Sequence, residues 1–157
     1  MRTNTRVDKD HMLLVLLNQV QVILAKVREQ ELRPFGLNSQ IQAGVLYHLI
    51  TCNKPITIAE IAHRLLREPH TMSALLDRME RQGLVRKNRR NTGRNRIMLE
   101  ITGKGKRVYK RTKGMNLIRV IFSHLNEEER DDLLAYLRVL RTEASRYVGR
   151  NLSPPFP

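Results

Sequence analysis

Aromatic residues and cysteine are scarce in this chain. Its 157 residues include no Trp, three Phe and four Tyr, and a single cysteine, Cys52. One cysteine excludes an internal disulfide and is typical of a reducing compartment, so we expect a cytoplasmic protein. The scarcity of aromatic rings also argues against a membrane-surface helix, which needs interfacial aromatic anchors.

Signals for secretion, membrane insertion and catalysis are missing as well. The N-terminal sequence MRTNTRVDKDHM has no continuous apolar region and no small-residue cleavage site. The apolar run from Met12 to Leu17 is interrupted by polar residues and is shorter than the roughly 20 residues that span a membrane. No nucleophile–base pair, glycine-rich phosphate loop or paired carboxylates stand out, so we predict no enzyme and no cofactor.

Positive charge is what the sequence has in excess. Lys and Arg number 29 against 15 Asp and Glu, a net charge of +14. Residues 64–113 alone hold 16 of these cations and 4 acids, which is +12 of the total. A charge concentrated in one segment indicates a polyanionic partner, because a general aid to solubility would be spread along the chain. Nucleic acid is the partner that this distribution favours.

Periodic apolar residues predict helices at both ends of the chain. Residues 10–33 repeat Leu and Val at three- and four-residue steps, with Asp10 as the expected N-cap. A long helix is expected from the Thr102 cap to about His124, and whether Gly114 in its interior bends it stays open. The last helix follows the capping box Asn126-Glu-Glu-Glu129. These helices have more apolar surface than one small domain can cover, so we expect 10–33 and 115–148 to be dimerisation helices of a homodimer.

The middle of the chain, 38–113, has the signals of a helix-turn-helix followed by a hairpin. A helix capped by Asn38 or Ser39 comes first, and the capping box Thr57-Ile-Ala-Glu60 opens a short second one. Pro69 then starts a helix that ends at Gly83. Two short helices joined by a tight turn are a helix-turn-helix.

A hairpin follows that motif. Residues 84–90 and 96–101 are its predicted strands, around a polar tip that contains Gly93. A hairpin in this position is a wing. The predicted fold is mainly α with a small β-hairpin wing: one domain over 1–157, built of a winged helix-turn-helix core and terminal dimerisation helices.

Several short motifs of the central segment resemble one known family. They are Ala-Glu-Ile-Ala (59–62), Leu-Leu-Asp-Arg-Met-Glu (75–80), Gly-Leu-Val (83–85), Ile-Thr-Gly-Lys-Gly (101–105) and, after the core, Leu-Asn-Glu-Glu-Glu-Arg (125–130). In combination they are similar to the MarR family of bacterial transcription regulators. The resemblance implies a dimeric repressor released from DNA by a small, often aromatic or phenolic ligand, bound where the dimer helices meet the winged core. The pocket residues stay unidentified.

The sequence departs from the family in the wing. The family's wing commonly carries Asp-x-Arg near its tip, and here these places hold Gly93 and Asn95. Arg94 and Arg96 flank the missing arginine, so which arginine enters the minor groove stays open.

The residues expected to contact DNA lie on the second helix of the motif and on the wing. Small polar side chains near a helix start allow close approach to base edges in the major groove, and wing arginines suit phosphates or a narrow minor groove. The predicted DNA-contacting residues are His70, Thr71, Ser73, Ala74, Asp77, Arg78, Arg89, Arg90, Arg94, Asn95 and Arg96. The alternative for Arg78 is a surface ion pair with Asp77 or Glu80.

A metal site and two rival functions are disfavoured. His48 and Cys52 lie four residues apart on one helical face, but two ligands do not make a zinc site, and Cys52 is better explained as a small buried hydrophobe. One rival function is a non-specific architectural or single-strand-binding protein. Single-strand binding is expected to use stacking aromatics, and the central segment has none. The other is a protein-interaction module, and the concentration of +12 net charge in residues 64–113 argues against it.

Overall fold

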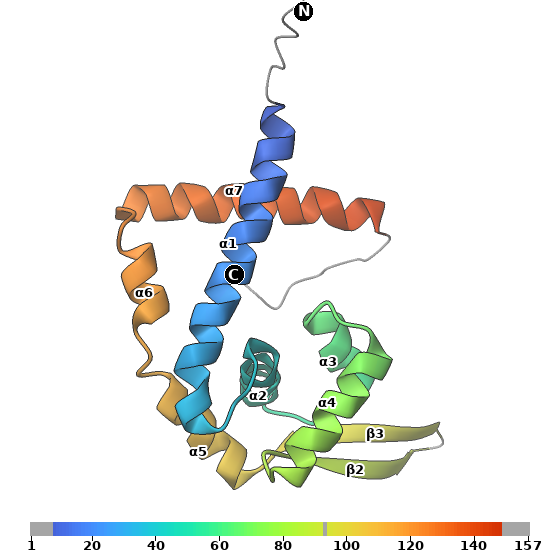
Figure 1. Cartoon of the computed structure of the whole chain (residues 1–157). Helices are drawn as coiled ribbons and strands as arrows, with labels where there is room; N and C mark the ends of the chain where they lie inside the picture. Colours follow the sequence, from blue (N-terminus) through green and yellow to red (C-terminus); the bar gives the residue numbers. More distant parts are fainter. Residues whose placement is uncertain (1–7, 93, 149–157) are drawn as a thin grey trace, which may run out of the picture.

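The computed structural model describes residues 8–92 and 94–148, without the side chains of 89–96. A winged core forms the lower half of the molecule, and long helices rise from it (Figure 1). The core consists of α2 (Gln40–Cys52), β1 (Ile56–Thr57), α3 (Ile58–Arg64), α4 (Pro69–Arg81), β2 (Val85–Thr92) and β3 (Arg94–Ile101). The outer elements are α1 (Lys9–Leu32), the 3-10 turn η1 (Arg33–Phe35), α5 (Gly103–Thr112), α6 (Leu117–Phe122) and α7 (Glu127–Tyr147).

The sheet has three antiparallel strands in the order β1-β3-β2. Ile56 pairs with Leu99, and Val85 pairs with Ile101. The hairpin extends to the pair Thr92 and Arg94, so both strands run further toward the tip than the sequence predicted. The mainly helical fold with a small sheet and a hairpin wing is confirmed.

The core of the winged half is apolar, and α4 shows why. Met72, Leu76 and Met79 follow one another at four- and three-residue steps and are buried against the rest of the core. Leu46 of α2, like Leu99 of β3, has no exposed surface. Alternation along β3 therefore turns Leu99 inward.

Most predicted helix starts are confirmed. The side chains of Ser39, Thr57 and Asn126 each accept a hydrogen bond from a backbone N–H in the first turn of α2, α3 and α7. Gly83 ends α4 in the left-handed conformation, at φ +70°. One predicted cap is wrong: α1 begins a residue earlier than expected, and Asp8 accepts from the N–H of Asp10.

The predicted single helix from 102 to about His124 is wrong, because α5 and α6 are separate. Three successive N–H groups after α5 bond to carbonyls only three residues back, from Lys113 to Met115, and this tightened turn ends the helix. The N–H of Leu117 donates instead to Glu31 Oε1 of α1, at 2.8 Å. Gly114 lies in this turn, where the conformational freedom of glycine weakens a helix, and the contact with α1 accompanies the break.

The outer helices are largely uncovered. In α1 only Leu32 is buried, and α6 and α7 contain no buried residue. By length and composition alone, 9–35 could also cross a membrane, the one such segment among the described residues. That is weak evidence, because a long apolar helix that packs in a soluble assembly has the same composition.

Candidate nucleic-acid interface

One side of α4 faces solvent along its whole length. His70, Thr71, Ala74, Asp77 and Arg78 are exposed and Ser73 is half-buried, as predicted. The opposite side holds Leu76 and Met79 in the core. The helix therefore presents short side chains in its first two turns and a cation, Arg78, one turn later. Its buried residues anchor it in the core.

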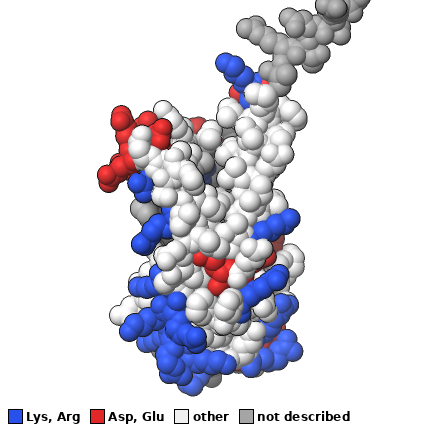
Figure 2. All heavy atoms as spheres, turned by 60° about the vertical axis from the view of Figure 1, so that its left-hand side comes forward, with Lys and Arg blue, Asp and Glu red and all other residues white. Residues whose placement is uncertain are grey.

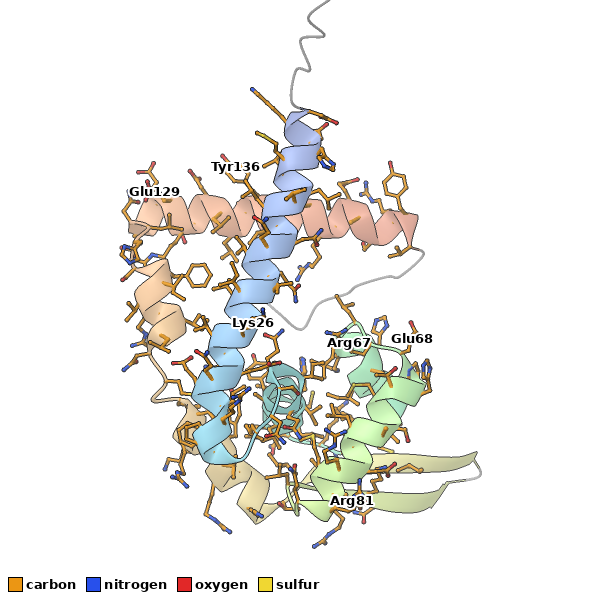
Figure 3. All side chains as sticks on the ribbon, in the orientation of Figure 1. Lys26, Arg67, Glu68, Arg81, Glu129 and Tyr136 are labelled. Carbon is orange, nitrogen blue, oxygen red and sulfur yellow. The ribbon has the colours of Figure 1, made fainter. Side chains whose placement is uncertain are left out.

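A strained turn sets the angle between α3 and α4. Leu66 lies in the left-handed region at φ +54°, which is unfavourable for a leucine. The N–H of Arg67 donates to the carbonyl oxygen of Ala62 across the turn, at 2.9 Å. Arg67 and Glu68 then stand at the outer corner of the motif (Figure 3). No sequence pattern predicts this strain, since glycine is the residue usually found in that conformation.

Two acids of α4 hold the base of the wing. Glu80 Oε1 accepts from the backbone N–H of Lys87 on β2, at 2.7 Å, and Lys87 Nζ forms an ion pair with Asp77. Neither acid pairs with Arg78 among the described residues, so that alternative does not occur there. Asp77 is thus exposed but already engaged. Sequence reasoning missed Lys87, because a contact over ten residues leaves no local pattern.

Thr102 joins the end of the wing to α4. Its Oγ1 donates to the carbonyl oxygen of Gly83 at 2.6 Å and accepts from the N–H of Gly105 at 3.0 Å. Gly105 is buried, and a Cβ there would lie 2.2 Å from the carbonyl oxygen of Leu84. In the Ile-Thr-Gly-Lys-Gly motif, the backbone of α5 at Gly105 therefore packs directly against the backbone at Leu84.

The wing arginines lie outside the described side chains, and Gly93 outside the described residues altogether. The backbone register pairs Arg90 with Arg96 and Asn91 with Asn95. Arg89 lies on β2 and Arg94 on β3, so these cations belong to the two strands of one hairpin. Their predicted contacts with DNA stay a prediction.

Lysines and arginines dominate one face of the winged half. Figure 2 shows them gathered at the base of the molecule, with mostly uncharged surface above. All six cations of α5 and its C-cap are exposed: Lys104, Lys106, Arg107, Lys110, Arg111 and Lys113. The α5 part of the basic segment seen in the sequence is therefore a solvent-exposed basic surface.

A pocket of about 660 Å³ opens between the end of α2, the end of β3 and α5. Its floor is apolar, formed by residues such as Leu49, Pro55 and Ile101. Glu100 is the one acid among the described residues that line it. Its cations come from two sides, one from the loop before β1 and the rest from α5 and its C-cap: Lys54, Lys106, Lys110 and Lys113.

Tyr109 also lines the pocket. Burial raises the pKa of its phenol above the ordinary value of 10.0, and neighbouring Tyr47 raises it further. The hydroxyl therefore stays protonated at neutral pH and can donate a hydrogen bond. A pocket with an apolar floor, a phenol donor and a cationic rim suits a small organic anion.

His48 and Cys52 do not form part of a metal-binding cluster among the described residues. His48 is only 1% exposed and Cys52 is half-buried against the core. Across residues 8–92 and 94–148, no three His, Cys, Asp or Glu side chains gather in a way that could hold a metal ion. Burial, together with the charge of Arg64, lowers the pKa of His48, so its imidazole is neutral at pH 7.

Comparison with known proteins gives the same architecture. The model of the MarR family matches residues 35–94. No curated protein matches the chain. An organohalide sensing transcriptional regulator in its 2,4-dichlorophenol bound form superposes with a TM-score of 0.88 at 21% identity, covering 100% of this chain and 95% of the other.

Two further structures extend the comparison. A MarR family transcriptional regulator from Streptomyces coelicolor gives a TM-score of 0.78 at 23% identity, over 88% of this chain and 97% of its own. MepR of S. aureus in complex with DNA gives 0.71 at 21% identity, over 82% and 94%. The TM-scores show a common fold, and at 21–23% identity the likeness extends to the fold alone. Residues 35–94 thus match the MarR family model, and the chain shares the winged helix-turn-helix fold of the regulators it superposes on.

Proposed function

We propose that this protein is a transcription regulator that binds specific sites in double-stranded DNA, and that it acts as a homodimeric repressor. The observation that carries the proposal is the uncovered polar face of α4 beside a hairpin wing, within a segment that holds +12 of the net charge. Short side chains on a rigid helix fit the major groove, and cations beside it fit the flanking phosphates.

In the proposed complex, α4 reads base edges and the wing contacts the backbone or the minor groove. The base-reading candidates are His70, Thr71, Ser73, Ala74 and Arg78, with Asp77 limited by its ion pair to Lys87. Because Glu80 and Asp77 both tie β2 to α4, the wing is set at a fixed angle to the helix. That rigidity lets the arginines Arg89, Arg90, Arg94 and Arg96, with Asn95, meet DNA in register with α4.

The outer helices support a dimer. Leu13, Leu16 and Ile23 of α1 are each more than half exposed, and α7 adds Leu137 and Leu140. Tyr136 points away from the winged core (Figure 3). An exposed apolar surface of this extent, on a chain with a net charge of +14, is typical of a protein–protein interface. A second copy would bury it and place two α4 helices about one turn of DNA apart on a near-palindromic site.

The pocket beside α5 supports release by a small ligand. One of the superposing regulators holds 2,4-dichlorophenol, and the pocket here pairs an apolar floor with the lysine rim and Tyr109. A small aromatic ligand, such as a phenol or an aromatic acid, would lie against Ile101, where the wing passes into α5. Because α5 leads on to α6, an occupant can favour a different spacing of the two winged cores and so lower DNA affinity.

A titration of duplex DNA tests the DNA contacts. Arg94→Ala with Arg96→Ala should weaken binding at fixed salt about tenfold or more, since each charged contact contributes roughly 1.5–3 kcal/mol, and should leave the thermal midpoint unchanged. Thr71→Ala with Arg78→Ala should reduce the preference for the selected site over random DNA. Unchanged affinity and unchanged preference in both variants would contradict the proposal.

A further inference from the structure

A row of cations crosses the base of the molecule outside the proposed DNA contacts and outside the pocket. It consists of five exposed side chains on three elements, here called the basal stripe: Arg33 of η1, Arg111, Arg107 and Lys104 of α5, and Arg81 at the end of α4. Positions 104, 107 and 111 follow one another at three- and four-residue steps, so they share one side of α5.

The stripe and the pocket lie on opposite edges of the same helix. The buried side of α5 holds Gly105 and Thr112, with Val108 packed against the core. At about 100° per residue, Lys106, Lys110 and Lys113 turn to one edge of that side, and the stripe turns to the other. A pocket ligand would therefore engage the first set of lysines and leave the stripe free.

Neighbouring elements hold the stripe in place. Lys104 Nζ donates to the carbonyl oxygen of Gln82 at 2.7 Å, which ties α5 to the end of α4. The guanidinium of Arg111 stacks over Phe35 of η1, 5.4 Å from the ring centroid. No carboxylate pairs with any stripe cation within the described part of the chain. Two of the five cations, Lys104 and Arg111, are therefore held by neighbouring elements, and the charge of the stripe is not neutralised by these contacts.

Cations at the start of α5 work against the stability of the helix. Lys104 and Lys106 lie in its first turn, where the positive end of the helix dipole disfavours a cation. Arg111 lies in the last turn, where the dipole favours one. Like charges also repeat along the exposed edges of the helix. A polyanion that neutralises Lys104 in a complex would remove the cost of its position.

The stripe does not face the same way as the proposed reading surface. The wing and the α3–α4 corner extend to one side of the core, and α5 lies on the other (Figure 1). Arg81 projects from the lower end of α4 (Figure 3). Lysine and arginine gather at the base when this side is turned forward (Figure 2). A ten-residue helix is about 15 Å long, which matches about four nucleotides of one B-form strand.

We infer that the basal stripe is a second phosphate-binding track, which holds duplex DNA flanking the segment read by α4 and the wing. The inference rests on the proposed DNA-binding function, and it adds that the protein contacts a longer stretch of duplex DNA than α4 and the wing cover. Duplex DNA is the partner because five exposed cations in a row, none of them paired with a carboxylate in the described part of the chain, complement a regularly spaced phosphate backbone.

The test compares two charge-matched triple variants on two lengths of duplex. The stripe variant is Arg81→Gln, Arg107→Gln and Arg111→Gln. The control is Lys26→Gln, Arg119→Gln and Arg138→Gln, three exposed cations on the outer helices. The probes are a site selected from random-sequence duplexes, cut to about 20 bp or kept within about 40 bp, since two half-sites one turn apart occupy about 20 bp.

The wild-type protein should bind the longer duplex more tightly, with a steeper salt dependence. The stripe variant should bind the longer duplex at least tenfold more weakly than the control does, and its salt slope there should be shallower by about one for each phosphate that it no longer neutralises. Its affinity for the short duplex should stay within about threefold of the control's, since the read segment is intact. Thermal unfolding and the single variant Arg107→Gln serve as checks on folding.

Two outcomes would count against different claims. If the stripe variant and the control lose the same affinity for DNA on both lengths of duplex, the cations act only through the overall electrostatic field of the protein. The proposed phosphate-binding track is then wrong. If the wild-type protein prefers neither selected duplex over random DNA, the proposed function itself fails, whatever the variants do.

Discussion

Backbone contacts at Gly105 leave no room for a side chain. A Cβ there would lie 2.2 Å from the carbonyl oxygen of Leu84 and 2.9 Å from Ile101, whereas at Gly103 the nearest atom is the flexible end of Arg107, at 3.5 Å. We expect Gly105→Ala to lower the free energy of unfolding by about 1–3 kcal/mol, because it forces the wing base away from α5. Gly103→Ala is the control and should leave stability unchanged or slightly raised. Denaturant unfolding of both variants gives the comparison, and equal stabilities would contradict the close contact.

His48 should make stability depend on pH. Its burial and the charge of Arg64 lower the pKa of the folded imidazole below the ordinary 6.5. The unfolded chain therefore takes up a proton below about pH 6.5 that the folded chain resists, and stability must fall as the pH drops through that range. The thermal midpoint, measured from pH 8 to pH 5, should decline less steeply in His48→Leu than in the wild-type protein. Parallel profiles would show that this histidine does not contribute.

At this scale, sequence patterns predict what is local. The Thr57–Glu60 capping box and the left-handed Gly83 are confirmed, since each depends on neighbours three or four residues away. The ion pair of Asp77 with Lys87 and the clash that excludes a side chain at Gly105 were not predictable, because the partners meet only in the folded chain.

Among the elements, the wing depends on α4 for its orientation. Glu80 accepts the N–H of Lys87, the third residue of β2. Glu80→Ala should lower the free energy of unfolding by about 1 kcal/mol and reduce DNA affinity severalfold, because the strands are no longer set against the helix. Glu80→Gln keeps an acceptor oxygen and should retain most of the affinity. A DNA titration beside thermal unfolding separates the two effects, and wild-type affinity in Glu80→Ala would refute the coupling.

The element boundaries show where sequence patterns stop being sufficient. The order of helices and strands in the core follows from periodicity and caps, and it is confirmed. The pattern does not decide the split between α5 and α6, which is accompanied by a hydrogen bond from the N–H of Leu117 to Glu31, 86 residues away in the sequence. The hairpin is longer than predicted for a related reason: the polar tip has no core to mark its register, and pairing with the opposite strand extends it.

For the whole molecule, the exposed apolar helices predict an obligate pair. α1, α6 and α7 contain a single buried residue between them, Leu32, so their stability must come largely from a partner. We expect a dimer in sedimentation at micromolar concentration and a thermal midpoint that rises with concentration. Leu137→Glu with Leu140→Glu should give a monomer with much weaker DNA binding. A wild-type protein that stays monomeric at tens of micromolar would contradict this arrangement.

Sequence-specific binding by a pair of α4 helices is tested most directly by selecting bound fragments from a random pool of duplex DNA with the purified protein, followed by sequencing. We predict one enriched, near-palindromic motif whose half-sites lie about 10 bp apart, as two α4 helices in successive major grooves require. Thr71→Ala with Arg78→Ala should blur the motif without removing the affinity that comes from phosphates. A pool with no enriched sequence, bound as tightly as the selected fragments, would contradict specific recognition and point to a non-specific DNA-binding protein.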